Sequence, residues 1–173
     1  MNMHLGYVYE ENHQVVNPAE FIPAYRAGAR LSHAWIRSLR SDALPSRVKP
    51  VDLSYLGEDM QPYAHRQWQY STLDIVPVDA FALFHSTAGT DRARSVQDAL
   101  VRNGVAVRRL EVGQAFDFTD VGEDATAGKR WVESYGLHEG NVLLIRPDQH
   151  VAAVHHANGD ENDVVRKVLD MRL

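Results

Sequence analysis

Apolar residues follow their most regular pattern in the last third of the chain. Residues 141–146 (NVLLIR) form a short, almost unbroken apolar run, which is typical of a strand covered on both faces. Pro147-Asp148 supplies turn residues and the apolar run resumes at Val151–Val154, so this stretch predicts an antiparallel hairpin with a polar tip. Asn158-Gly159-Asp160 then ends the hairpin and caps a helix with apolar residues at helical spacing from Val164 to Leu169.

A strand, a helix and a second strand are predicted upstream of this hairpin. Ala80–His85 and Val105–Val112 have the pattern of strands, and Thr90 is expected to be the N-cap of a helix that ends at Asn103-Gly104. The apolar residues of that helix recur at Ala93, Val96, Leu100 and Val101. Because the connections are short, these three elements are predicted to form a right-handed parallel unit.

Two further segments connect this unit to the hairpin. Phe116–Ala127 is predicted to be an acidic loop, and Thr126–Tyr135 a helix that ends at Gly136, with Trp131 and Val132 facing the core. From residue 71 onward the predicted order is β-α-β-α-β-β-α. This is the thioredoxin-like α/β sandwich, here without redox cysteines.

The first 70 residues are predicted to add a strand and a long wrapping segment. Leu5–Glu10 is the predicted strand, and Asn17–Ala29 and Arg30–Arg37 are predicted to be extended. Ser38–Pro50 is polar and is expected to be mobile, whereas the aromatic-rich stretch Asp52–Tyr70 is expected to pack across the surface. We therefore divide one structural domain into a wrapping extension (residues 1–70) and a thioredoxin-like core (residues 71–173).

Composition narrows the function without identifying it. The chain has 173 residues, of which 45% are apolar and 24% are charged, as in ordinary soluble domains. Its net charge of −5 disfavours nucleic-acid binding. No apolar run approaches the roughly 18 residues of a membrane span, and no secretory segment follows Met1, so a cytoplasmic protein is expected.

Candidate chemistry is sparse. The turn where thioredoxins carry their reactive thiol is residues 85–89 (HSTAG), and the chain has no cysteine, so thiol chemistry is excluded. On the predicted hairpin, alternation places His150 and His156 on one face and His155 on the other, without a third metal ligand. Ser32 and His33 are adjacent, so their side chains diverge in an extended segment and a catalytic triad is not predicted.

Four stretches, in order, resemble motifs of the FAD-dependent aromatic hydroxylases, the family of phenol and dichlorophenol monooxygenases and polyketide hydroxylases. Gly28–Trp35 (GARLSHAW) is similar to the family's P-G-x-R-x-P-H-x-W, and Ser71–Asp74 followed by Phe81–Phe84 to its S-T-L-D-L…F-x-L-L. Leu143–Val154 (LLIRPDQHVAAV) resembles V-L-V-R-P-D-x-H-V-A-W, and Leu5–Tyr9 (LGYVY) resembles L-G-Y-R-Y.

The chain also departs from these motifs. Ala27 and Ser32 stand where the family usually has prolines, and Ala153 where a tryptophan is common. The stretch from about Arg37 to Gln67 also looks longer than in most members.

The resemblance implies the C-terminal thioredoxin-like domain of such an enzyme, which supports structure and subunit contacts. FAD and NAD(P)H would belong to a preceding flavin domain, which is the expected partner together with a second copy of the enzyme in a dimer. No catalytic, cofactor-binding or metal-binding residue is carried over to this chain.

Ten residues match the motifs and are the candidate structural site. They are Gly28, Arg30, His33, Trp35, Ser71, Asp74, Arg146, Pro147, Asp148 and His150. If buried, Arg30 and His33 need partners, and Asp74 is the candidate. Arg146 and Asp148 are expected either to bridge the hairpin tip or to face a neighbouring domain, and the reading in which these charged and polar groups are merely surface residues stays open.

Two other classes stay open. The chain is alternatively a stand-alone protein that binds a small molecule or a partner through Asp52–Trp68, or a metal-dependent enzyme that uses the hairpin histidines.

Overall fold

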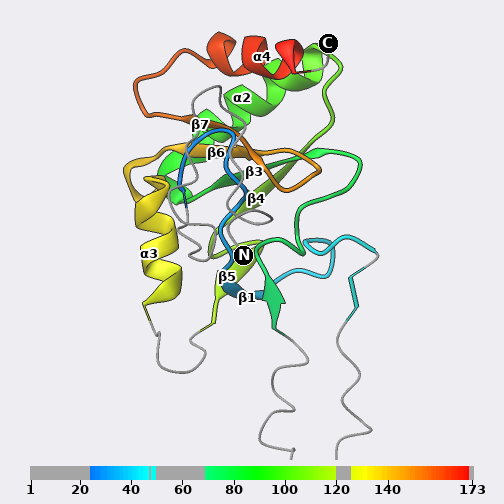
Figure 1. The fold of residues 1–173 in the computed structure, drawn as a ribbon, viewed down its shortest axis with the longest axis vertical. Coiled ribbons are helices and arrows are strands. Elements are labelled where there is room, and N and C mark those ends of the chain that lie inside the picture. Colours follow the sequence, from blue (N-terminus) through cyan, green and yellow to red (C-terminus); the bar gives the residue numbers. More distant parts are fainter. Residues whose placement is uncertain (1–23, 47, 50–68, 120–125, 172–173) are drawn as a thin grey trace, which may run out of the picture.

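The computed structural model describes residues 24–46, 48–49, 69–119 and 126–171. Within them, two small sheets and three helices pack together, with α2 and α4 on one side of the larger sheet (Figure 1). Within these described ranges no helix is long and apolar enough to cross a membrane.

The larger sheet has four strands in the order β4-β3-β6-β7. They are β3 (Phe81–His85), β4 (Val107–Glu111), β6 (Val142–Ile145) and β7 (Val151–His155). Strand β3 is parallel to β4 and antiparallel to β6, and β6 and β7 form the hairpin. The predicted parallel unit and hairpin are therefore both confirmed, and the fold is thioredoxin-like.

Helices α2 (Thr90–Arg102) and α4 (Glu161–Asp170) cover one face of this sheet. The Asp160 side chain accepts a hydrogen bond from Asn162 N at the start of α4, as expected for a cap. The predicted cap of α2 is wrong, because the N-cap is Gly89 and Thr90 is already the first helical residue after the 3₁₀ turn η2 (Thr87–Gly89).

The end of α2 also differs in one respect from the predicted apolar stripe. Leu100 is fully buried, whereas Val101 is 54% exposed. Consecutive helical positions differ by about 100°, so Val101 points toward solvent. Asn103 is the C-cap and Gly104 follows with φ 71°, so the helix ends where the sequence predicts.

The opposite face of the four-stranded sheet is covered by α3 (Ala127–Ser134), the short turn η3 (Leu137–Glu139) and a second sheet. That sheet is antiparallel, in the order β2-β1-β5, with β1 (Trp35–Ser38), β2 (Tyr70–Ser71) and β5 (Phe116–Phe118). The prediction of a loop from Phe116 to Ala127 is wrong at its start, because Phe116–Phe118 pairs with β1.

Aromatic rings join the two sheets to α3. The Phe84 ring contacts those of Phe116 and Trp131 at centroid distances of 5.7 Å, and Trp131 contacts Tyr135 at 4.9 Å. Trp131 is 2% exposed, as predicted for the inward face of α3. Edge-to-face pairs of this kind add to the area that the rings bury, so the N-terminal strands share one core with the thioredoxin-like elements.

Several expectations lie outside the described residues. They include the predicted strand Leu5–Glu10 and the aromatic candidate site Asp52–Trp68. Tyr70, at the end of the aromatic stretch, is described and is buried in β2.

Candidate functional site

The first motif stretch lies along the tip of the β6–β7 hairpin. Gly28 N donates to Val151 O and Val151 N donates to Ala29 O, both at 2.8 Å. Leu31 N donates to Gln149 O at 2.8 Å, and Arg30 forms an isolated bridge with His150. Residues 28–31 therefore act as a short additional strand, and two motif stretches that are more than 100 positions apart become neighbours.

Gln149 connects a third stretch to the first two. Its side-chain Oε1 accepts from Arg30 Nη2 at 2.9 Å, and its Nε2 donates to Leu73 O at 3.1 Å. Gln149 adopts φ 68°, a left-handed conformation that a side chain other than glycine takes rarely. Sequence reasoning did not select this residue, and its position just after the Pro147-Asp148 turn was the only signal of an unusual backbone.

The partner of His33 is Ser71. His33 Nδ1 and Ser71 Oγ are 2.8 Å apart, and Ser71 Oγ also accepts from Leu73 N at 3.1 Å. The Asp74 carboxylate accepts a hydrogen bond from Ser71 N at 2.8 Å. A short aspartate side chain can bond the backbone N–H three residues before it, and in this way Asp74 closes the turn in which it lies.

The expected pairing of Asp74 with Arg30 or His33 is therefore wrong. Burial of the His33 ring lowers its pKa. Asp74 acts on this ring only through its negative charge, which opposes part of that lowering.

Thr72 attaches the wrapping segment to the core, a role that the sequence did not predict. It is fully buried, and its Oγ1 donates to Ser32 O at 2.8 Å and accepts from Ala34 N at 3.1 Å. The Ser32 carbonyl also accepts from the indole of Trp131 at 2.9 Å, and Ser32 N donates to the hydroxyl of Tyr135 at 3.2 Å. A threonine beside a turn carries no sequence signal of such burial.

The hairpin tip holds the ion pair that its sequence suggested. Arg146 Nη2 lies 2.6 Å from Asp148 Oδ2, and both side chains are partly exposed. Asp148 Oδ1 also accepts from His150 N at 3.2 Å. Of the two alternatives expected for Arg146 and Asp148, the structure shows the bridge at the hairpin tip.

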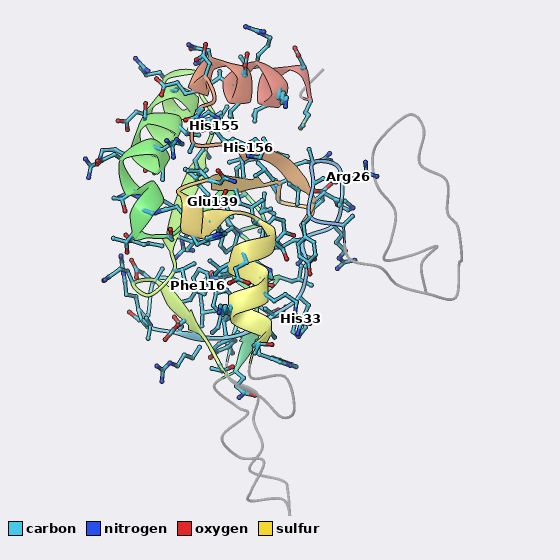
Figure 2. All side chains as sticks on the ribbon, turned by 90° about the vertical axis from the view of Figure 1, so that its left-hand side faces the viewer. Arg26, His33, Phe116, Glu139, His155 and His156 are labelled. Atoms are coloured by element: carbon cyan, nitrogen blue, oxygen red, sulfur yellow. The ribbon has the colours of Figure 1, made fainter. Side chains whose placement is uncertain are left out.

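These contacts present a group of polar and aromatic side chains to solvent, which we call the motif surface: His33, Trp35, Asp74, Arg146 and Asp148. Trp35 is 45% exposed, and its ring meets that of His33 edge to face at a centroid distance of 4.6 Å. His33 projects from the end of the molecule that carries β1 (Figure 2). The motif surface thus combines an exposed indole with the Arg146–Asp148 ion pair and with the Asp74 carboxylate, which Ser71 N holds.

The turn after β3, where thioredoxins carry their reactive thiol, holds His85 and Ser86 in this chain. His85 is fully buried, and burial lowers the pKa of its ring. Its Nδ1 lies 2.9 Å from Ser86 O, whereas its Nε2 is buried with no hydrogen-bond partner. Ser86 Oγ donates to Leu137 O at 2.5 Å, so the hydroxyl is used in holding the turn against η3.

The other chemical candidates are separated in space. Ser32 is buried and His33 is exposed, so they diverge as predicted. His155 is buried and His156 is exposed, and among the described residues no three potential metal ligands cluster.

A cleft of about 450 Å³ opens between the segment at residues 25–27 and the C-terminal end of α3. Tyr135 and Asn141 lie at its base, and Arg26, Glu139 and His156 surround it (Figure 2). Asn141 is committed to structure, because its Nδ2 donates to Tyr135 O at 3.3 Å and its Oδ1 accepts from Ala157 N at 3.1 Å. The cleft therefore offers charges of both signs, aromatic surface and the imidazole of His156.

The topology defines a cysteine-free thioredoxin-like α/β domain, and solved structures of flavin-dependent hydroxylases contain the same fold. A structure of aklavinone-11 hydroxylase with FAD and aklavinone matches with a TM-score of 0.55 and 22% identity over 94% of this chain and 24% of that chain. The flavin-dependent monooxygenase PieE, in complex with FAD and substrate, matches with a TM-score of 0.57 and 22% identity over 93% of this chain and 23% of that chain. RebC with bound 7-carboxy-K252c matches with a TM-score of 0.51 and 22% identity over 96% and 23% of the two chains.

The chain thus spans about a quarter of the length of these three chains. The resemblance inferred from the motifs is confirmed at the level of the fold. No protein-family model matches the sequence, and no curated protein matches it either.

Proposed function

We propose that this chain is the C-terminal structural domain of an FAD-dependent aromatic hydroxylase and is not catalytic by itself. The observation that carries the proposal is the match of 93–96% of this chain to about a quarter of three such enzymes. In this proposal FAD, NAD(P)H and the aromatic substrate bind to the remaining part of the enzyme, which acts in the cytoplasm as a dimer.

The motif surface is the proposed contact with the flavin domain. Tryptophan and arginine are enriched in protein–protein interfaces. The apolar surface of an exposed indole stays in contact with water unless a partner covers it. The motif residues come from three distant stretches, and hydrogen bonds of Gln149 and Ser71 connect these stretches through Arg30, Leu73 O and His33. Such pre-organisation is what a docking face between two rigid domains requires.

The test begins with the reading frame upstream of Met1. A continuous frame that encodes a dinucleotide-binding fingerprint is expected, and the full-length enzyme is then produced with Trp35→Ala and with Val78→Ala as the matched control. Val78 is 63% exposed and lies outside the motif surface.

We expect Trp35→Ala to speed flavin release and lower the melting temperature of the full enzyme, while Val78→Ala changes neither. A 173-residue chain that itself retains flavin and oxidises NAD(P)H contradicts the proposal. So does a stop codon and ribosome-binding site directly upstream of Met1.

The cleft at residues 25–27 supports a second candidate, a stand-alone small-molecule-binding protein. Its volume of about 450 Å³ is within the range of ligand pockets, and Tyr25 and Tyr135 meet there at a centroid distance of 5.1 Å. This candidate predicts a free-standing reading frame and a ligand that co-purifies with the chain and is lost from a Tyr25→Ala variant.

A further inference from the structure

Strand β4 forms an open edge of the four-stranded sheet. It pairs only with β3, so one side of its backbone has no neighbouring strand among the described residues. Phe81 N donates to Ala106 O and Val112 N donates to His85 O, which places the even-numbered backbone groups toward β3. By alternation, the N–H and C=O groups of Val107, Arg109 and Glu111 point away from the sheet.

Among the backbone groups of β4 that point away from the sheet, the carbonyl oxygens have more hydrogen-bond partners than the N–H groups. Val107 O accepts from Gln97 Nε2 at 3.4 Å, and Glu111 O accepts from Gln114 N at 3.2 Å and Ala115 N at 2.8 Å. The outer N–H groups of Val107, Arg109 and Glu111 donate to no described residue. The edge is therefore rich in donors and selects a partner that supplies carbonyl oxygens.

Three arginines and one glutamate lie along the same edge. A hollow of about 290 Å³ there is lined by Arg40, Arg108 and Arg109 and by the carboxylate-bearing Glu111. Arg40 pairs with Asp42 at 2.9 Å, and the charge of Arg108 also acts on this carboxylate. Neither Arg108 nor Arg109 makes a hydrogen bond or a close ion pair with a described residue. Alternation places these two guanidinium groups on opposite faces of β4. A chain with net charge −5 thus gathers arginines where its backbone donors are open.

We propose that the β4 edge binds an extended acidic segment of a partner protein, which adds a fifth strand to the sheet. The segment's carbonyls accept from the outer N–H groups of β4, and its acidic side chains face Arg108 on one side and Arg109 on the other. Pairing with a second copy of this chain is the competing occupant that the test must detect, because a register centred on Leu110 would place Arg109 opposite Glu111. The opposing possibility is that the arginines only protect the edge from pairing, as charged residues do on many edge strands.

The experiment uses the full chain and a fluorescent peptide of about seven residues with two adjacent glutamates among valines, so that one carboxylate projects from each face of the added strand. The same peptide with lysines in place of the glutamates is its counterpart. We expect binding of the acidic peptide alone, weakened by salt. On binding, the backbone amides of Val107, Arg109 and Glu111 should exchange more slowly with deuterium, because only these donors point outward.

Two matched double variants distinguish an effect of the arginines on β4 from a general effect of positive charge on the protein. Arg108→Ala combined with Arg109→Ala removes two arginines at the edge, and Arg94→Ala combined with Arg166→Ala removes two exposed arginines on α2 and α4. The first pair should weaken acidic-peptide binding about tenfold, since exposed ion pairs contribute up to about 1 kcal/mol each, and the second should leave it unchanged. Arg109→Pro removes the outward N–H of residue 109 and leaves the hydrogen bonds between β4 and β3 in place. This variant should show no peptide-induced slowing of amide exchange along β4.

Four results overturn the proposal. They are failure of the acidic peptide to bind, equal weakening by both arginine pairs, amide protection at positions other than those of the outer edge, and self-association of the chain through β4. The first of these outcomes would assign the arginines to edge protection.

Discussion

Replacing Thr72 by valine is the sharpest test of how the wrapping segment is attached to the core. The side chain is fully buried, and its hydroxyl both donates to Ser32 O and accepts from Ala34 N. Valine keeps nearly the same shape but provides neither function. The substitution therefore tests the hydrogen bonds rather than the packing.

The expected cost follows from which partners are left unsatisfied. The Ser32 carbonyl keeps its hydrogen bond from Trp131 Nε1, so it loses only one of two donors. Ala34 N loses its acceptor in a buried site, which costs about 1–3 kcal/mol. We expect the free energy of unfolding to fall by about 2 kcal/mol, which lowers the melting temperature of a chain of this size by roughly 4–8 °C.

Urea unfolding, followed by circular dichroism and tryptophan fluorescence, measures this change, and Thr72→Ser is the matched control. Serine keeps the hydroxyl and loses one methyl group, so it should cost only about 0.8 kcal/mol. A Thr72→Val protein as stable as the wild type, or more stable than Thr72→Ser, would refute the role assigned to these hydrogen bonds.

Two further predictions concern a strained turn and buried histidines. A Cβ added at Gly136 (φ 66°) would overlap the Asn141 amide, whereas at Gly104 (φ 71°) it would meet nothing within 4 Å. Alanine should therefore cost about 1–2 kcal/mol at Gly104 and more at Gly136 by urea unfolding, and equal costs would contradict this geometry. Burial lowers the pKa of His85 and His155, so the unfolded chain binds protons that the folded chain does not, and the free energy of unfolding should decrease as the pH falls below about 6.5. His85→Phe should make this decrease shallower, and a wild-type profile that is flat between about pH 8 and pH 5 would contradict the prediction.

The elements with strong periodicity were predictable from the sequence. The β6–β7 hairpin, α4 and α3 each carry a local apolar pattern, together with turn or capping residues at their ends. Strand β5 was missed because it has only three residues, and its partner β1 lies about 80 positions earlier. A segment so short becomes a strand only when the core buries Phe116 beside Phe84.

The candidate site was predictable only as a set of residues. The motifs identified Arg30, His33 and Asp74, but the structure pairs Arg30 with Gln149 and His33 with Ser71. Asp74 instead closes its own turn. Gln149 and Thr72 hold the stretches together. Both are polar residues beside turns, and the sequence around them is typical of ordinary surface positions, so it did not indicate this role.

By itself, the sequence determined the order of the core elements and excluded thiol chemistry, because apolar periodicity is local and a chain without cysteine has no thiol in any fold. Only the tertiary structure decided which polar groups are partners and which side chains face solvent. A hydrogen bond needs its two atoms within about 3 Å. At the motif network those atoms come from residues 28–34, 71–74 and 146–150, stretches that become neighbours only when both sheets have formed.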